Sequence, residues 1–302
     1  MGYILDDKMV IGVSSRALFD LSAENEIFER DGLLAYQKYQ LEHENDVLKP
    51  GPGFELIKSL LNLNVLAGKT LVEVIIMSRN STNTSLRVFN SIKHYGLDIT
   101  RAVLASGASL APYLKAFKTD LFLSAYEDDV QNAINAGIAA GTICTDHTYT
   151  ENANYSGQIR IAFDGDAVLF SDASEMVYKE KGLKAFEQNE AENADVPLEA
   201  GPFAAFLKKL SSLQEELGVE NSPIRTALVT ARSAPAHERV IKTLRAWNVR
   251  LDEALFLGGL EKKAFLKAFG AQIFFDDQVV HTGPASEEVP SARVPYKDKA
   301  PG

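Results

Sequence analysis

Cysteine and histidine are scarce in this chain. A single cysteine, Cys144, is present among 302 residues, so no internal disulfide can form. The five histidines are scattered and lack the spacing that is typical of zinc ligands. These absences exclude a disulfide-stabilised scaffold and a zinc protein of the usual kind, and they favour the cytoplasm as the compartment.

Basic charge is also limited. The chain has 31 Lys and Arg residues against 41 Asp and Glu residues, which gives a formal net charge of -10 and a pI near 5.1. A nucleic-acid-binding surface normally needs a basic face, so we expect no nucleic-acid partner. Any anionic ligand must therefore be held by a local group of cations, by a metal ion or by backbone N–H groups.

Long apolar runs are missing as well. The longest apolar stretch, residues 65–77, is interrupted by Lys69 and Glu73. The N-terminus carries Asp6 and Asp7 where a signal peptide would have basic residues. We therefore expect no membrane span and no secretory signal.

The most informative feature that is present is an internal repeat. Several blocks of the first half recur in the second half in the same order and at nearly the same separation, which chance rarely produces. Both copies begin with a buried strand that runs into a turn. The blocks are IGVSSRALF (11–19) with IAFDGDAVL (161–169), GLLAY (32–36) with GLKAF (182–186), Gly51-Pro52 with Gly201-Pro202, and residues 105–126 with residues 257–278.

Short apolar runs rich in β-branched and aromatic residues alternate with stretches of helical periodicity in both copies. This alternation predicts an α/β fold with parallel strands and right-handed crossovers. We expect two Rossmann-like parallel-sheet units from an internal duplication, at residues 1–150 and 151–282, with the repeat itself at roughly 8–150 and 158–282. A helical insert near 172–200 is predicted to cap the second unit. The proline-containing segment 283–302 is expected to be an extended tail.

The second copy carries two aspartates directly after its first strand. Asp164 and Asp166 are two positions apart on an extended segment, so both carboxylates can point into one site at the carboxyl end of the sheet. This arrangement suits a nucleophile and an acid/base for hydrolysis of a phosphate ester. A DxD pattern by itself is weak evidence, because it also occurs in solvated turns and helix caps.

Three further motifs follow in the order that this chemistry requires. Thr230 ends the strand TALVT, where its hydroxyl and the backbone N–H groups of the adjacent residues, Ala231 and Arg232, can hold phosphoryl oxygens. Lys262 can neutralise negative charge, although the adjacent Lys263 is an alternative. Asp276 follows the strand QIFF and offers a carboxylate to an Mg²⁺ ion shared with Asp164, with Asp277 as the alternative ligand.

The series DGDAV, VT, GGLEK and FFDDQ resembles the four motifs of the haloacid dehalogenase superfamily. More specifically, FDGDAVLFSD, LVTARSA, DEALFLGG and FFDDQ resemble the cytosolic 5'-nucleotidase I family, as do VSSRALFDL and SRNSTNTSLRVFNSI in the first half. The resemblance covers most of the chain. It implies a haloacid dehalogenase-like fold and hydrolysis of nucleoside 5'-monophosphates, with AMP as a leading substrate.

The resemblance also implies a role for each motif residue. It makes Asp164 the nucleophile and Asp166 the acid/base, whose backbone carbonyl also meets Mg²⁺. It makes Thr230 and Lys262 the groups that stabilise the phosphate, and Asp276 the metal carboxylate. The expected metal ligands are therefore Asp164, Asp166 and Asp276, and Mg²⁺ is the expected cofactor.

The first copy keeps the frame of the repeat without these chemical groups. Ser14 and Arg16 stand where the second copy has Asp164 and Asp166. Arg79 and Asn80 remain as polar residues at the end of a strand, where helix capping is the alternative interpretation. We expect them to contact the nucleotide substrate or a nucleotide effector across the interface between the halves.

Three functions stay open at this point. The predicted one is an Mg²⁺-dependent 5'-nucleotidase that uses an aspartyl-phosphate intermediate. A phosphatase of another small ester, such as a sugar phosphate, is the second, and a non-catalytic nucleotide-sensing protein is the third. A homo-oligomer is compatible with the sequence, which identifies neither the effector nor the base preference.

Overall fold

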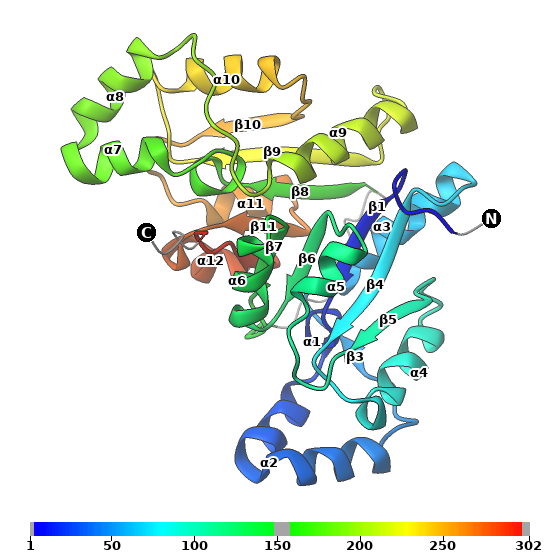
Figure 1. The fold of residues 1–302 in the computed structure, drawn as a ribbon. Coiled ribbons are helices and arrows are strands. Elements are labelled where there is room, and N and C mark those ends of the chain that lie inside the picture. The colour runs from blue at the N-terminus through cyan, green and yellow to red at the C-terminus, as the bar shows by residue number, and fades with distance from the viewer. Residues whose placement is uncertain (1–2, 148–157, 298–302) are drawn as a thin grey trace. The chain divides into compact units, whose positions relative to one another are not determined.

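The computed structural model describes residues 3–147 and 158–297. The chain forms two compact units, Met1–Asn154 and Tyr155–Gly302. The unit boundary expected at residues 150 and 151 lies outside the described residues. Figure 1 shows that strands and helices alternate along the chain in each unit, as the sequence pattern predicts.

The parallel sheet of the first unit has the strand order β5–β4–β1–β6–β7. Its central strands are completely buried, which explains why they are largely apolar. A short antiparallel pair, β2 with β3, lies apart from this sheet. The strands are β1 (Met9–Val13), β2 (Phe19–Asp20), β3 (Lys49–Pro50), β4 (Val72–Ser78), β5 (Arg101–Leu104), β6 (Leu121–Ser124) and β7 (Ala139–Ile143).

Helices fill the connections between these strands. The longest, α2, is interrupted at Gly32, whose φ of 80° lies in a region that glycine adopts without strain. The helices are α1 (Ser15–Leu18), α2 (Ser22–Glu42), α3 (Phe54–Ala67), the 3₁₀ turn η1 (Thr82–Thr84), α4 (Leu86–His94), α5 (Ala111–Ala116) and α6 (Glu127–Asn135).

The parallel sheet of the second unit has the strand order β10–β9–β8–β11–β12, which matches the order in the first unit strand for strand. Its strands are β8 (Ile159–Phe163), β9 (Ile224–Thr230), β10 (Glu253–Phe256), β11 (Ile273–Asp276) and β12 (Ser291–Arg293). Its helical segments are η2 (Gly165–Leu169), α7 (Ala173–Lys181), α8 (Leu183–Glu192), α9 (Ala204–Leu217), α10 (His237–Ala246), α11 (Lys263–Phe269) and α12 (Val279–Ser286).

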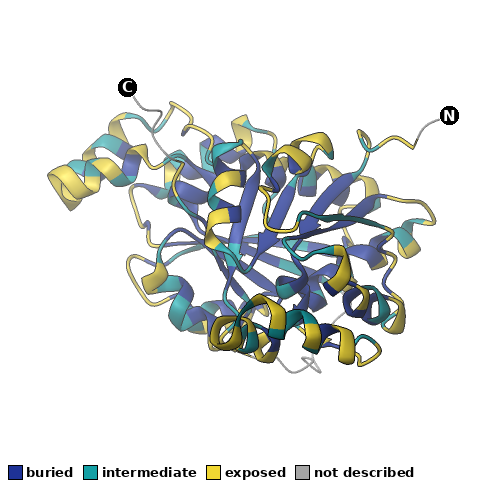
Figure 2. Ribbon diagram, turned by 60° about the horizontal axis from the view of Figure 1, so that its bottom comes forward, coloured by how far each residue is buried: buried dark blue, intermediate teal, exposed yellow. Residues whose placement is uncertain are grey.

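Burial follows the layered arrangement within each unit. The central strands are buried, whereas the helices carry exposed residues on their outer sides (Figure 2). In the second unit, Phe163, Phe203 and Phe275 pack against one another beneath the strand ends, and the rings of Phe203 and Phe275 lie 4.6 Å apart between centroids. This apolar layer gives the polar strand ends a rigid base.

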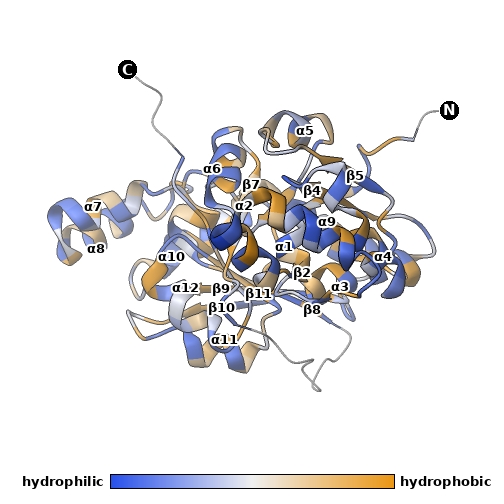
Figure 3. Ribbon diagram, turned by 90° about the horizontal axis from the view of Figure 1, so that it is seen from below, coloured by the Kyte–Doolittle hydropathy of each residue, from blue (hydrophilic) through white to orange (hydrophobic). Residues whose placement is uncertain are grey.

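The predicted insert near 172–200 contains helices α7 and α8, which are largely hydrophilic (Figure 3). Its return to the sheet requires Gly201. A Cβ atom at this position would lie 2.3 Å from the carbonyl oxygen of Phe170 and 2.5 Å from that of Val168, which no side chain can tolerate. The Gly-Pro pattern of the repeat therefore marks a close approach of two backbone segments.

The C-terminal segment differs from the extended tail that we expected at 283–302. Helix α12 continues to Ser286, and β12 pairs with β11 through Phe274–Ser291 and Asp276–Arg293. Pro290 is compatible with this structure because it lies just before β12, where no donor of that strand is lost. Among the described residues, no helix is long and apolar enough to cross a membrane.

Candidate active site

Asp164 lies at the carboxyl end of β8, where its backbone N–H donates to the carbonyl oxygen of Phe275 over 2.8 Å. Its side chain is buried and lies 2.7 Å from the Nζ of Lys262. The ammonium group of Lys262 also donates to Oδ2 of Asp276 over 2.6 Å. The structure thus brings three of the predicted site residues together around one buried cation.

The two adjacent lysines are now distinguished. Lys262 is 2% exposed and immediately precedes α11, whereas Lys263 is directed to the surface and pairs with Glu287. Burial alone would lower the pKa of Lys262, but the carboxylates of Asp164 and Asp276 raise it overall. Lys262 therefore stays charged and is the lysine that meets the aspartates.

A buried acidic cluster lies at the same place. Asp164, Asp276 and Asp277 each offer an oxygen, and these oxygens lie within 4.8 Å of one another. Burial, followed by the charge of Asp164, raises the pKa of Asp276 well above its usual range. Burial likewise raises the pKa of Asp277 to about 7. Carboxylates kept together at this cost are typical of a cation site.

Asp277 has a further property of a metal ligand. Its Oδ1 is buried and has no hydrogen-bond partner among the described residues. Its Oδ2 accepts a hydrogen bond from the hydroxyl of Tyr296 over 2.5 Å. Asp276 Oδ1 accepts from the backbone N–H of Gln278 over 2.9 Å, which orients that carboxylate. The oxygen set thus fits a hard divalent cation, with Asp277 among the groups that could bind it.

Asp166 follows Asp164 in the irregular turn η2, in which Ala167 has a φ of 61°. Its carboxylate accepts two hydrogen bonds from Arg232, Nε to Oδ2 at 2.8 Å and Nη2 to Oδ1 at 2.6 Å. Burial raises the pKa of Asp166, although Arg232 partly opposes this effect. The structure thus gives this aspartate a partner different from that of Asp164.

Thr230 ends β9, as predicted. Its Oγ1 accepts a hydrogen bond from the backbone N–H of Arg232 over 3.2 Å, and a Cβ atom added at Gly165 would lie 3.3 Å from it. The hydroxyl therefore lies against the turn between Asp164 and Asp166. Ala231 is exposed between two buried residues. The guanidinium of Arg232 contacts carboxylates here, so its predicted contact with a phosphate stays a prediction.

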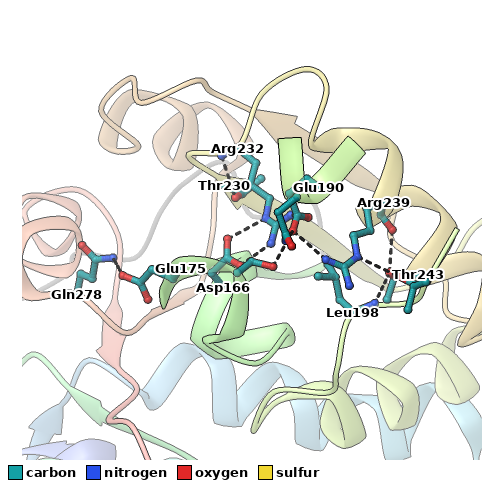
Figure 4. A network of polar contacts seen from close by, with 12 residues as sticks. Asp166, Glu175, Glu190, Leu198, Thr230, Arg232, Arg239, Thr243 and Gln278 are labelled. Atoms are coloured by element: carbon teal, nitrogen blue, oxygen red, sulfur yellow. Dashed lines mark hydrogen bonds and ion pairs between the residues drawn. The ribbon is translucent and has the colours of Figure 1, made fainter. Parts of the chain in front are cut away.

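Glu190 on α8 connects the insert to this site (Figure 4). It is completely buried, pairs with Arg232, and accepts from Arg239 over 2.9 Å and from the hydroxyl of Ser174 over 2.8 Å. Burial would raise the pKa of Glu190, but Arg232 and its other donors lower it overall. By sequence, the acidic stretch 187–195 is expected to be solvated surface of the insert rather than a metal site, and the burial of Glu190 contradicts this expectation for that residue.

Sequence reasoning also missed Glu175 and Tyr296. The side chain of Gln278 donates to Oε1 of Glu175 over 3.2 Å (Figure 4). The hydroxyl of Tyr296 lies 2.9 Å from Oε2 of Glu175. These contacts link α7 to the end of β11 and to the segment after β12. No local motif marks such residues, because their partners are more than 100 positions away in the chain.

Arg79 and Asn80 lie in the first unit, after β4. They line a cavity whose lining residues all belong to that unit. Asn80 Oδ1 accepts from the hydroxyl of Tyr36 over 3.3 Å, and Arg79 pairs with Asp129 at 3.2 Å. These contacts differ from simple helix capping, and the predicted contact with substrate or effector stays a prediction.

Comparison with known proteins places the chain in a family. A model of the 5'-nucleotidase family matches residues 1–301. Cytosolic 5'-nucleotidase 1B from Homo sapiens is 42% identical over 287 residues, which are 90% of this chain and 46% of that protein. The chain thus spans about half the length of this curated relative.

Among solved structures, a chain of the "Structure of Pnkp1/Rnl/Hen1 complex" matches with a TM-score of 0.34 and 15% identity over 97% of both chains, a likeness too low to carry an argument. The family match, in contrast, covers nearly the whole sequence and includes every residue of the site described above. It agrees with the motifs that the sequence shares with cytosolic 5'-nucleotidase I. The chain therefore belongs to the 5'-nucleotidase family, of the cytosolic type I that its motifs resemble.

Proposed function

We propose that this protein hydrolyses nucleoside 5'-monophosphates, with AMP as the leading candidate, to a nucleoside and phosphate. Family membership supports the reaction class. The observation that carries the proposal is the position of Asp164, a buried carboxylate held 2.7 Å from the ammonium of Lys262 at the edge of an acidic cluster. A carboxylate in this setting is oriented by its cationic neighbour, as a nucleophile must be.

In the proposed reaction Asp164 attacks phosphorus, so that an O–P bond to the aspartate forms while the bond to the nucleoside 5'-oxygen breaks. Asp166 donates its proton to that leaving oxygen. Water then attacks the phosphorus of the aspartyl-phosphate, the O–P bond to Asp164 breaks so that phosphate leaves and the carboxylate is restored, and Asp166 takes a proton from this water. The raised pKa of Asp166 supports its acid role, because a carboxyl group must still be protonated near neutral pH to donate.

Lys262 and Thr230 would stabilise the phosphoryl oxygens, together with the backbone N–H groups of Ala231 and Arg232. The buried ammonium of Lys262 already offsets two carboxylates, so an approaching phosphoryl group would share it with them. Such fixed donors act strongly in a site with little water.

An Mg²⁺ ion fits the oxygen set of Asp164, Asp276 and Asp277, with the backbone carbonyl of Asp166 as a further candidate ligand. The unpartnered Oδ1 of Asp277 and the raised pKa values of both neighbouring aspartates support this assignment. When bound, Mg²⁺ would lower the charge repulsion between the carboxylates and the phosphate. Asp164, Asp166, Lys262 and Thr230 provide the nucleophile, the proton transfer and the phosphate contacts described above.

The insert that contains α7 and α8 is proposed to act as the cap of the site. Glu190 reaches Arg232, which holds Asp166, and Glu175 reaches the hydroxyl of Tyr296, which holds Asp277. Both contacts join the insert to groups that the mechanism uses. They support a haloacid dehalogenase-like arrangement, in which a cap covers an aspartate at a strand end.

We also infer that the two units arose by duplication. Their strand orders agree, and equivalent side chains make equivalent hydrogen bonds. Leu48 N–H donates to Ser91 Oγ over 2.9 Å, and Leu198 N–H donates to Thr243 Oγ1 over 2.9 Å. Both hydroxyls also donate to a carbonyl oxygen one helical turn earlier, over 2.8 Å in each unit.

One ion pair supports the same inference through a reversal of charge. Glu73 pairs with Arg101 in the first unit, and Arg225 pairs with Glu253 at the corresponding positions of the second. Both pairs join the same two strands of their sheets, β4 with β5 and β9 with β10. When a duplicated structure diverges, the acidic and basic residues of an ion pair are expected to be able to exchange positions while the pair itself is kept.

Two other functions are compatible with the site. A phosphatase of another small ester would need the same aspartates, whereas a nucleotide-sensing protein would not need Asp164 as a nucleophile. Phosphate release from AMP and from sugar phosphates, with Mg²⁺ and with EDTA, separates these functions. The cytoplasm as the compartment and a homo-oligomeric state remain part of the proposal.

The nucleophile is tested by Asp164→Asn. We expect kcat to fall by about a thousandfold or more, because an amide cannot attack phosphorus while its size is nearly unchanged. A circular dichroism melt shows whether the variant is folded. The matched control is the exposed Asp172→Asn, which should keep normal turnover. Activity of Asp164→Asn close to that of the parent protein would contradict the assignment.

A further inference from the structure

The first unit contains a cavity of about 560 Å³ at the carboxyl ends of its parallel strands. Its polar wall comes from segments that follow β1, β4 and β6, and α2 forms the opposite wall. The volume lies within the range of small-molecule sites, and the edge of the sheet at which it opens is the usual place for a ligand in an α/β unit. Its principal lining residues are Arg16, Phe28, Leu33, Tyr36, Arg79 and Tyr126.

Part of the cavity wall is cationic, because Arg16 and Arg79 both line it. The ring of Tyr126 is a neighbour of both: its centroid lies 5.9 Å from the guanidinium carbon of Arg16 and 5.7 Å from that of Arg79. Arg16 donates from Nη1 to Asn25 over 3.0 Å, yet its buried Nε has no hydrogen-bond partner among the described residues. A buried donor of this kind is expected to find an acceptor.

The second arginine is only partly neutralised. Arg79 Nε lies 3.2 Å from Oδ1 of Asp129, but neither atom makes a well-aligned hydrogen bond within the described part of the chain. Burial raises the pKa of Asp129, and this effect exceeds the opposing effect of Arg79. The side chain of Arg79 is 33% exposed, so the guanidinium can take an additional acceptor from the cavity.

Another part of the cavity wall is apolar. Phe28 and Leu33 of α2 line it and are 47% and 55% exposed. The rings of Phe28 and Tyr36 are 5.9 Å apart in an edge-to-face arrangement. Such a surface suits the flat face of an aromatic ring, so the cationic and apolar parts of the wall together match a molecule with an anionic group and an aromatic part.

The cavity is not a second metal-dependent site. Ser14 and Ser124 occupy the positions that correspond to Asp164 and Asp276, and the acidic cluster found among the described residues lies entirely in the second unit. Arg16 occupies the position of Asp166. Two serines and one arginine thus replace three carboxylates at this strand edge, and an anion can be bound there without Mg²⁺.

We propose that this cavity binds a phosphorylated aromatic small molecule, namely a nucleotide, through Arg16 and Arg79 and without a metal ion. Guanidinium groups match the geometry of phosphate oxygens, and Phe28 and Leu33 provide the contact for the base. The site is distinct from the residues to which catalysis is assigned. The inference does not depend on turnover and goes beyond the proposed hydrolysis.

The test is calorimetric titration of the full chain in EDTA with three probes, AMP, adenosine and inorganic phosphate. We expect AMP to bind at least about tenfold more tightly than adenosine or inorganic phosphate. Only AMP has both a phosphate for the two arginines and a base for Phe28 and Leu33. Arg16→Ala and Arg79→Ala should each weaken AMP binding by about tenfold or more. Arg30→Ala is the control, since Arg30 lies on α2 but is exposed and paired with Asp31.

A melt by circular dichroism verifies that each variant is folded. If Arg16→Ala or Arg79→Ala does not fold, it is replaced by Arg79→Lys and by Phe28→Ala, which changes an exposed residue. Both of these variants should weaken AMP binding. Undetectable binding of AMP at millimolar concentration in EDTA would overturn the proposal. AMP binding that the cavity variants leave unchanged would also overturn the proposal. So would AMP binding that Lys262→Ala abolishes.

Discussion

Arg232 donates two parallel hydrogen bonds to the carboxylate of Asp166, at 2.8 Å and 2.6 Å. A guanidinium can make this paired contact, whereas an ammonium group provides a single point of charge. The orientation of Asp166 therefore depends on a side chain from the segment after β9.

The first prediction concerns this contact. Arg232→Lys should lower kcat for AMP by about tenfold or more with a smaller change in KM, because a misoriented Asp166 transfers its proton poorly. Its pKa should also rise when one of the hydrogen bonds that favour the carboxylate is lost, which moves the alkaline limb of the kcat profile to higher pH. Steady-state kinetics across pH measure both effects. Arg225→Lys, in a half-exposed pair with Glu253, is the control. An unchanged pH profile would contradict the positioning role.

Glu190 gives the second prediction. Glu190→Gln should lower the free energy of unfolding by about 3–5 kcal/mol, because the buried Arg232 and the partly buried Arg239 would lose their shared counter-charge. Urea unfolding monitored by circular dichroism measures this loss. Glu192→Gln, at an exposed position on the same helix, should change stability by less than about 0.5 kcal/mol. Equal stability of both variants would show that Glu190 is not a structural link.

The third prediction separates the two adjacent aspartates. Asp276→Asn and Asp277→Asn should each raise the Mg²⁺ concentration required for half-maximal activity, since each change removes a charged oxygen from the cluster. Asp276→Asn should have the larger effect, because it also leaves Lys262 with one carboxylate partner fewer. Titration of activity with Mg²⁺ provides the comparison. An Mg²⁺ requirement that only Asp277→Asn changes would assign the metal role to Asp277.

The fourth prediction concerns pH. Burial raises the pKa of Asp277 from 3.8 to about 7, so the metal-free protein holds this group partly protonated at neutral pH. Mg²⁺ binds the carboxylate, so binding should release protons, and the affinity should rise as pH increases through about 7. Without the ion, this group should make the fold less stable as pH rises from about 4 to about 7.

Calorimetry in two buffers of different ionisation enthalpy measures the released protons. Asp277→Asn should reduce their number and flatten the pH dependence of the affinity. Asp172→Asn, at an exposed position, is the control. An affinity that is independent of pH between 6 and 8 would contradict the raised pKa.

The position of Asp164, Thr230 and Asp276 at strand ends was predictable from the sequence. Parallel strands place their carboxyl ends at one edge of a sheet, so polar residues that follow buried apolar runs must come close together. The agreement between the strand orders of the two units was predictable for the same kind of reason, because local patterns of apolar and turn residues recur along the chain. Both predictions depend only on patterns formed by residues that are close together in the sequence.

Other features depend on contacts between residues far apart in the chain. Lys262 and Lys263 are equivalent by sequence, and only packing buries the first and exposes the second. In the sequence, Glu190 looks the same as its solvated acidic neighbours. Only the structure shows that its carboxylate pairs with Arg232 and Arg239. Strand β12 forms because the edge of β11 provides its hydrogen bonds, which the prolines around it do not reveal.

The sequence by itself thus determined the α/β pattern and the residues at each strand end, because these follow from local periodicity and from the edge at which parallel strands finish. Only the tertiary structure decided which groups are paired, since pairing depends on burial and on distances between segments that the chain separates. Asp166 shows both parts of this result. Its place after β8 is a local property, whereas its partner, Arg232, comes from another strand.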